Sequence, residues 1–301
     1  MLDRDQIKFY EENGYLVIED AIAPEQLATL RCVTSEFIDR SRQVSESNDV
    51  YDLDAGHSAA EPRLTRIKLP HLQHPIYWET LTAAPMTAIL TAVLGPDVRL
   101  HTSKLNTKAP GGGAAVEWHQ DWAFYPHTND DLLAVGLMLE DVAEENGPLM
   151  VIPGSHKGPV LDHTSNGVFC GAVDPADPQL DLASAVTLTG KAGTISLHHV
   201  RTLHGSAPNM SDRARLVLFY ECGAADAWPI NGNSGPFTGM PQAAMWDDMQ
   251  KRIICGSQPR VARLEPVPVI MPVPPAPDST SIFKVQESGG AVSAFADPEA
   301  A

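Results

Sequence analysis

The chain has 301 residues, of which 43% are hydrophobic and 20% charged, a composition that supports a folded core and excludes a disordered polymer. Acidic residues outnumber basic ones by 38 to 21, so the formal charge is −17 at pH 7. This charge would repel the phosphates of nucleic acid and anionic membranes, so we expect a small-molecule substrate and neither a nucleic-acid nor a membrane partner.

The first residues lack the basic and apolar regions of a signal peptide, and no apolar run is long enough to span a bilayer. We therefore expect a cytoplasmic protein.

Asp3 and Gln6 form a capping-box pattern, which predicts a short helix ending at Gly14. A buried strand over 15–18 and helices from Pro24 and over 85–94 follow, whereas the polar segment 41–61 predicts a long loop.

After residue 95 the pattern becomes mostly β. Short apolar runs at 132–139, 149–152, 194–197 and 216–220 alternate with turn signals, which is the spacing of a barrel or sandwich. Seven prolines between 259 and 277 favour an extended surface segment, and the last fifteen or so residues are expected to fray. We predict one domain over 1–301, with a helical part at 1–95, a β core at 96–225 and a partly disordered, Pro-rich extension at 259–301.

The segment Trp118-His119-Gln120-Asp121-Trp122 is the most informative about chemistry. Residues i and i+2 of a strand share a face, so His119 and Asp121 can direct an imidazole nitrogen and a carboxylate oxygen to one point. His204 lies 85 residues later, just after the strand predicted at 193–197. It is the candidate third ligand of a facial triad of two histidines and one carboxylate, the donor set of non-haem iron(II) oxygenases.

Arg215 stands at the head of an apolar run, eleven positions after His204. Its planar guanidinium suits bidentate binding of a carboxylate, such as that of a dicarboxylate cosubstrate. Alternatively, Arg213 and Arg215 mark a solvated strand entrance. His198 and His199 also precede His204, but adjacent strand residues point to opposite faces, so at most one of them faces inward.

A series of short motifs follows in a fixed order between about residues 5 and 221. They are His119-Gln120-Asp121, Glu145-Asn146-Gly147-Pro148-Leu149, Pro153-Gly154-Ser155-His156-Lys157-Gly158, Leu203-His204-Gly205-Ser206 and Arg215. Together they resemble the phytanoyl-CoA dioxygenase family of iron(II)- and 2-oxoglutarate-dependent oxygenases. The resemblance implies a mainly β fold with flanking helices, a cupin-like jelly roll or double-stranded β-helix, with its core at 96–225.

The resemblance also implies roles for individual residues. His119, Asp121 and His204 match the iron ligands that carry catalysis. Arg215 and Ser206 match the groups that bind the distal carboxylate of 2-oxoglutarate, while Lys104 and Arg66 align with positions near the same cosubstrate. Leu137 departs from the family, because many members carry a tryptophan there.

The implied activity is hydroxylation of an unactivated C–H bond of a small molecule, in which 2-oxoglutarate and dioxygen yield succinate and CO2. Retention of Asp121 favours hydroxylation over halogenation.

Trp122 and His127 are candidate substrate contacts. The alternatives are core packing for Trp122 and an exposed histidine without a role for His127. The alternative functions are a cupin-like metal-dependent isomerase or hydrolase and a non-catalytic ligand-binding jelly roll. The substrate's identity, including a CoA ester, and the choice between monomer and homodimer stay open.

Overall fold

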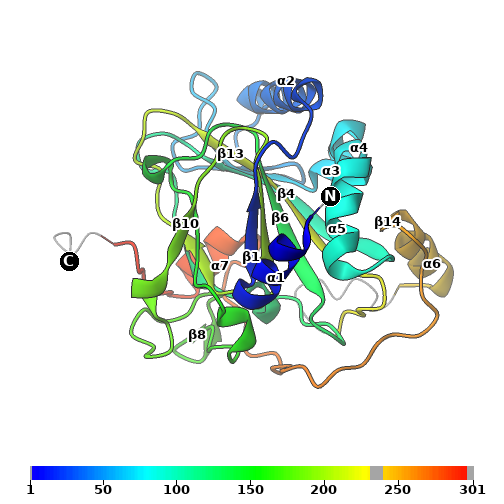
Figure 1. The fold of residues 1–301 in the computed structure, drawn as a ribbon. Coiled ribbons are helices and arrows are strands. Elements are labelled where there is room, and N and C mark those ends of the chain that lie inside the picture. The colour runs from blue at the N-terminus through cyan, green and yellow to red at the C-terminus, as the bar shows by residue number, and fades with distance from the viewer. Residues whose placement is uncertain (1, 231–239, 297–301) are drawn as a thin grey trace.

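The computed structural model describes residues 2–230 and 240–296 of the chain (Figure 1). The α-helices in this part are α1 (Arg4–Asn13), α2 (Pro24–Arg40), α3 (Pro70–Gln73), α4 (Pro75–Thr82), α5 (Ala84–Leu94), α6 (Gln242–Lys251) and α7 (Ile282–Ser288). The strands are β1 (Tyr15–Ile18), β2 (Tyr51–Leu53), β3 (Leu64–Lys68), β4 (Val98–Lys108), β5 (Val116–His119), β6 (Leu132–Met138), β7 (Leu149–Val151), β8 (Thr164–Ser165), β9 (Val168–Phe169), β10 (Val186–Leu188), β11 (Ile195–His199), β12 (His204–Ser206), β13 (Arg215–Ala224) and β14 (Ile253–Cys255). None of the helices described is long and apolar enough to cross a membrane.

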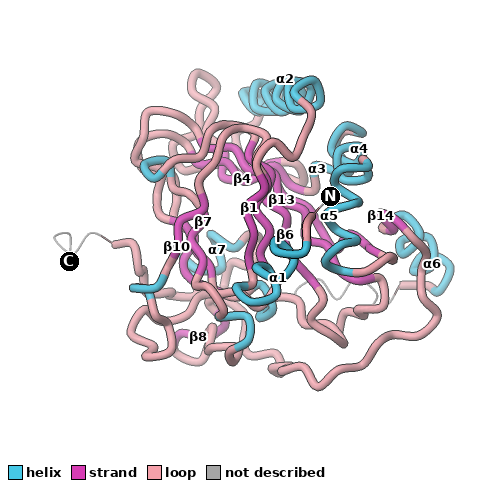
Figure 2. Tube along the Cα trace, in the orientation of Figure 1, coloured by secondary structure: helices cyan, strands magenta, loops and turns pink. Residues whose placement is uncertain are grey.

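Two antiparallel sheets form the body of the molecule. The larger has the order β1-β11-β6-β13-β4-β3-β2, with β14 also paired to β4, and the smaller has the order β10-β7-β12-β5. Helices α2, α4 and α5 lie on one side of the larger sheet, while β7 and β10 lie on the other (Figure 2). This is a double-stranded β-helix with flanking helices, so the predicted mainly β, cupin-like jelly roll is confirmed.

The two faces of the larger sheet have different surroundings, because side chains alternate along each strand. On β13, Leu218 and Tyr220 join the main hydrophobic core beneath the helices. Their neighbours Arg215, Phe219 and Glu221 face the interior between the two sheets, where they line cavities. The same strands therefore supply both the core and the candidate functional site.

The first 95 residues contain the predicted helices, but they also contribute strands to both edges of the larger sheet. Asp3 and Gln6 form the predicted capping box, and Gly14 closes α1 in the left-handed conformation. Strand β1 pairs with β11 as an edge strand. Strand β2 lies within the segment 41–61 that was expected to be a loop, because backbone pairing with β3 organises a stretch too short to show a periodic pattern.

The C-terminal segment packs against the smaller sheet rather than fraying over 287–296. Glu117 on β5 accepts hydrogen bonds from the Ser293 hydroxyl at 2.6 Å and the Ala294 amide at 2.8 Å. Gln286 on α7 accepts a hydrogen bond from the Glu117 amide at 3.0 Å. The composition of this end predicts disorder, but a buried carboxylate supplies acceptors that composition cannot reveal. Residues 297–301 lie outside the described residues.

One buried hydrogen bond joins the core strand β13 to the helical layer. The Tyr220 hydroxyl donates to the Tyr77 carbonyl of α4 at 2.5 Å. We predict that Tyr220→Phe lowers the free energy of unfolding by about 1–3 kcal/mol, the range for loss of a buried hydrogen bond. Urea unfolding measures this. Tyr10→Phe is the matched control, because the buried Tyr10 hydroxyl has no hydrogen-bond partner among the described residues, and an equal loss in both variants would contradict the prediction.

Candidate metal centre

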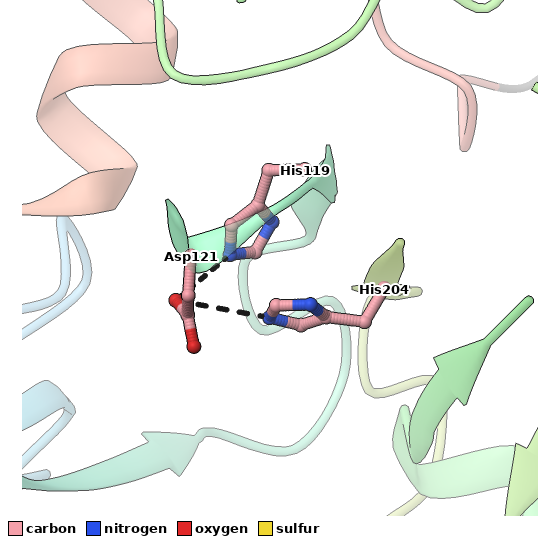
Figure 3. A group of neighbouring side chains, drawn as sticks. All are labelled: His119, Asp121 and His204. Carbon is pink, nitrogen blue, oxygen red and sulfur yellow. Dashed lines mark ion pairs between the residues drawn. The ribbon is translucent and has the colours of Figure 1, made fainter. Parts of the chain in front are cut away.

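Two residues that are close in sequence, His119 and Asp121, meet a third and remote residue, His204, between the two sheets (Figure 3). His119 ends β5, His204 begins β12, and the antiparallel pairing of these strands places the two histidines opposite each other. Asp121 follows β5 directly. Its Oδ1 lies 3.8 Å from His119 Nε2 and 4.0 Å from His204 Nε2, and one possible ligand atom from each of the three residues lies within 4.8 Å of the others. The structure thus brings together the three residues selected from the sequence.

Backbone hydrogen bonds orient both imidazoles for ligation. His119 Nδ1 lies 2.7 Å from the Glu117 carbonyl, and His204 Nδ1 lies 2.9 Å from the Thr202 carbonyl. Each Nδ1 therefore carries the proton and donates, which leaves the Nε2 lone pair directed toward Asp121. Burial lowers the pKa of His119 to about 4 and that of His204 well below its usual value. Both rings are neutral at pH 7, the form that binds a metal.

Asp121 is a buried but charged carboxylate. Burial alone would raise its pKa, but His198, His204 and Lys104 hold the pKa well below the usual range. Two neutral imidazole nitrogens and one carboxylate oxygen, all buried, are the donor set of a non-haem iron(II) site. The residues present therefore fit this metal.

Arg215 extends the site at the start of β13. Its side chain is 3% exposed, and Nη1 donates to the Gly147 carbonyl at 2.5 Å. Its Nε has no hydrogen-bond partner, and no described carboxylate pairs with it. Burial lowers the pKa of this guanidinium to about 10. Because an unpaired buried cation is costly, the site calls for an anionic ligand.

The neighbouring arginine behaves differently. The side chain of Arg213 is 60% exposed, where it pairs with Glu145 at 3.5 Å. The solvated strand entrance considered from the sequence therefore describes Arg213 but not Arg215.

A cavity, called here the inner pocket, joins the triad to Arg215. Its walls include Ser206 and Lys104, as expected from the sequence. Arg66 is not among them: Asp52 on β2 binds its guanidinium at 2.6 Å. Leu137 also lies elsewhere, because it belongs to the helix-facing side of β6 and packs in the main core. Its departure from the family pattern therefore does not alter this pocket.

A second cavity of about 530 Å³, called here the outer chamber, shares Lys104, Asp121 and Ile282 with the inner pocket. Arg66 lines this chamber instead. Its other polar walls include Glu221, which pairs with Lys104 at 2.7 Å.

Neither candidate substrate contact lines the inner pocket or the outer chamber. Trp122 packs in a cluster with Tyr125, and its indole nitrogen donates to the Pro268 carbonyl at 2.8 Å. His127 is buried, with its ring 5.2 Å from that of His101. The alternative of an exposed histidine is therefore wrong for His127, whereas Trp122 is buried in its cluster and also lines a separate cavity of about 160 Å³. Tyr125 and His101 line the outer chamber in their place.

Several wall residues were not selected from the sequence. Asn106 lies two positions after Lys104 on β4 and shares its face, so strand periodicity could have identified it. His198 faces the triad, which settles the question left open for the His198-His199 pair. Ile282 carries no local signal, because only the path of the C-terminal segment brings it to the site.

Comparisons with known proteins agree with this geometry. The phytanoyl-CoA dioxygenase (PhyH) family model matches residues 10–217. A probable alpha-ketoglutarate-dependent hypophosphite dioxygenase of Stutzerimonas stutzeri is 35% identical over 288 residues, which cover 94% of this chain and 97% of that protein. The ectoine dioxygenase of Bordetella parapertussis is 28% identical over 235 residues, covering 72% and 74%.

Solved structures show the same fold. The crystal structure of EctD from S. alaskensis with 2-oxoglutarate and 5-hydroxyectoine has a TM-score of 0.64 at 23% identity, covering 88% of this chain and 87% of that one. The carbocyclase SnoK from nogalamycin biosynthesis has a TM-score of 0.63 at 21% identity, covering 80% and 91%.

Buried histidines around the site predict an acid-sensitive fold. Burial lowers the pKa of both His127 and His163 from 6.5 to about 4. Between these pH values the unfolded chain binds protons that the folded chain does not, so stability is complete above pH 6.5 and falls as the pH drops toward 4. Denaturant unfolding at pH 7, 5.5 and 4.5 measures the slope. His127→Gln should reduce it, and a stability independent of pH over this window would refute the prediction.

Proposed function

The chain belongs to the phytanoyl-CoA dioxygenase family and is an iron- and 2-oxoglutarate-dependent dioxygenase, and we propose that His119, Asp121 and His204 hold its iron. The observation that supports this assignment most strongly is the convergence of two Nε2 lone pairs and one carboxylate oxygen in a single buried pocket. Dioxygen is the second cosubstrate. A metal-dependent isomerase or hydrolase and a non-catalytic jelly roll are not favoured, because the relatives are dioxygenases.

Bound iron(II) supplies the activation of dioxygen that is coupled to conversion of 2-oxoglutarate into succinate and CO2. The protein's own contribution is to place and isolate the reactants. The two neutral imidazoles and Asp121 would hold the metal, and the adjoining inner pocket would receive the cosubstrates. Burial of all three groups excludes water from the reaction.

Arg215 is the proposed anchor for the far carboxylate of 2-oxoglutarate. The Gly147 carbonyl fixes Nη1, while Nε has no partner in the described structure and is free to donate to an anion. Ser206 lines the same pocket and is proposed to donate its hydroxyl to this carboxylate. Little water would screen a salt bridge formed by this guanidinium, because Arg215 is buried.

Lys104 stands where the inner pocket meets the outer chamber. Its ammonium pairs with Glu221 at 2.7 Å, and both groups line the outer chamber. We assign Lys104 to this boundary, where it can contact either the cosubstrate or the substrate. Arg66 is assigned to the chamber wall, since Asp52 holds it away from the inner pocket.

The outer chamber is the proposed substrate site, and its walls suit a small polar molecule. His101, Tyr125, Glu221 and Lys104 offer hydrogen-bonding groups beside Asp121. A volume of about 530 Å³ is within the usual range for small-molecule sites but does not suit a long acyl chain with its carrier. A relative that aligns over 94% of this chain is named for a small polar substrate, hypophosphite. A cytoplasmic location and a monomeric or homodimeric state stay predictions.

The test of the function begins without oxygen. Iron(II) and 2-oxoglutarate are added anaerobically to the purified protein, and a visible metal-to-ligand charge-transfer band is expected. Air and candidate substrates are then admitted while succinate is measured. The panel contains hypophosphite, ectoine, L-proline and phytanoyl-CoA, and a small polar compound should stimulate succinate formation most. Absence of the band would refute the assignment.

Removal of the carboxylate ligand should abolish catalysis. We predict that Asp121→Ala lowers substrate-dependent succinate formation by at least about 100-fold, because even changes outside the ligand shell cost about 10- to 100-fold. Asp141→Ala is the control, since this aspartate pairs with Lys191 on the surface. Full activity of Asp121→Ala would exclude this residue as a ligand.

Arg215 should govern cosubstrate affinity. We predict that Arg215→Met raises the KM for 2-oxoglutarate about 30-fold or more, corresponding to a loss of about 2 kcal/mol or more for a buried charge pair. Arg215→Lys should also bind less well, because an ammonium cannot reproduce two parallel hydrogen bonds. The measurement is the dependence of initial rate on 2-oxoglutarate concentration. Arg213→Met serves as the exposed control, and equal effects at both positions would contradict the assignment.

A further inference from the structure

We propose that His198 is a positioning residue that donates a hydrogen bond from Nε2 to Asp121 Oδ2, so that only Oδ1 is presented to the metal. The inference rests on the proposed metal centre and adds a fourth residue, a third histidine, to it. His198 lies on β11 in the larger sheet, whereas His119 and His204 lie in the smaller sheet. The metal ligands would thus be held from both sheets.

The two oxygens of Asp121 face different partners. Oδ1 is the oxygen near His119 and His204, at 3.8 Å and 4.0 Å from their Nε2 atoms. Oδ2 lies 3.5 Å from His198 Nε2. A small shift of either side chain closes this distance to a normal hydrogen bond. The carboxylate is therefore oriented so that one oxygen serves the metal and the other serves His198.

The environment of His198 leaves it few other partners. Its side chain is 2% exposed, and neither ring nitrogen forms a hydrogen bond of good geometry with a described residue. Ala134 lies opposite it on β6, and the rings of Phe219 and His204 pack around it at centroid distances of 6.4 Å and 4.3 Å. A buried imidazole without a partner is destabilising, so the nearby Oδ2 is its natural acceptor.

The tautomer distinguishes His198 from the ligands. In His119 and His204, a backbone carbonyl holds the proton on Nδ1 and leaves Nε2 free as a metal ligand. No described carbonyl binds Nδ1 of His198. Its proton can therefore reside on Nε2, where it faces a carboxylate oxygen. This makes His198 a hydrogen-bond donor to a ligand rather than a fourth ligand.

A hydrogen bond to the outer oxygen would keep Asp121 from rotating or binding the metal through both oxygens. Groups that orient metal ligands in this way typically contribute about 10- to 100-fold in metal affinity or activity. His199, the next residue, points to the other face of β11, where its ring lies 5.2 Å from that of His156. It provides a matched control on the same strand.

The experiment is an anaerobic titration of metal-free protein with Co²⁺. Binding is monitored by the visible absorption of the bound Co²⁺. We expect His198→Leu, which removes the donor but fills the space, to weaken Co²⁺ binding about 10- to 100-fold and alter the absorption band. His198→Gln retains an N–H donor near the Nε2 position and should recover most of the affinity. His199→Gln should bind as the wild type does. Thermal unfolding of the metal-free forms reports whether each variant is folded.

The outcomes separate this inference from the proposed function. If the wild type binds Co²⁺ and His198→Leu binds it equally well, the positioning role is wrong while the metal centre stands. If His198→Gln binds Co²⁺ as weakly as His198→Leu does, loss of the hydrogen-bond donor is not the cause of the weaker binding, and the inference is again overturned. If the wild type binds no Co²⁺, or Asp121→Ala binds it undiminished, the metal centre itself is wrong and the inference falls with it.

Discussion

The backbone pairing of β12 with β5 is the constraint on which the site depends. It sets His204 opposite His119, although the two residues are 85 positions apart in the chain, and Asp121 follows at the end of the same strand. The backbone carbonyl two residues before each histidine then accepts a hydrogen bond from Nδ1, which keeps the ring proton on that nitrogen. The sheet and its local hydrogen bonds thus orient three possible ligand atoms toward one point. Such preorganisation lowers the entropic cost of binding a metal.

The C-terminal segment is the part of the molecule that completes the outer chamber. Ile282 on α7 lines both cavities, and Thr280 accepts a hydrogen bond from Arg66 at 3.0 Å. The anchors of this segment, Glu117 and Gln286, join it to β5, the strand that carries His119. These C-terminal residues lie beyond the range 10–217 matched by the family model. The chamber wall that they form therefore lies outside the part of the chain that the family model describes.

The sequence by itself determined the features that depend on local geometry. The capping box at Asp3 and the runs that became β6, β7, β11 and β13 follow from patterns within one element, whose periodicity fixes which side chains share a face. The spacing of His119 and Asp121 identified two of the three converging groups, although β5 ends at His119 and Asp121 begins a short 3-10 turn. The resemblance to the family, carried by motifs in a fixed order, implied the jelly-roll fold and the ligand role of His204. A strand's pattern also specifies that Lys104 and Asn106 face the same way, although it does not say what they face.

Tertiary structure alone decided which remote groups meet. Arg66 pairs with Asp52 and lines the outer chamber rather than the inner pocket, and Trp122 packs in a hydrophobic cluster outside both. Arg215 is buried and unpaired while Arg213 is solvated, and His198 faces the triad. Each of these outcomes depends on a partner from another element, contributed by the packing of two sheets and a returning C-terminal segment. Local sequence specifies the direction of a side chain within its own strand or helix. The partner that the side chain contacts is set by long-range packing, which residue spacing does not reveal.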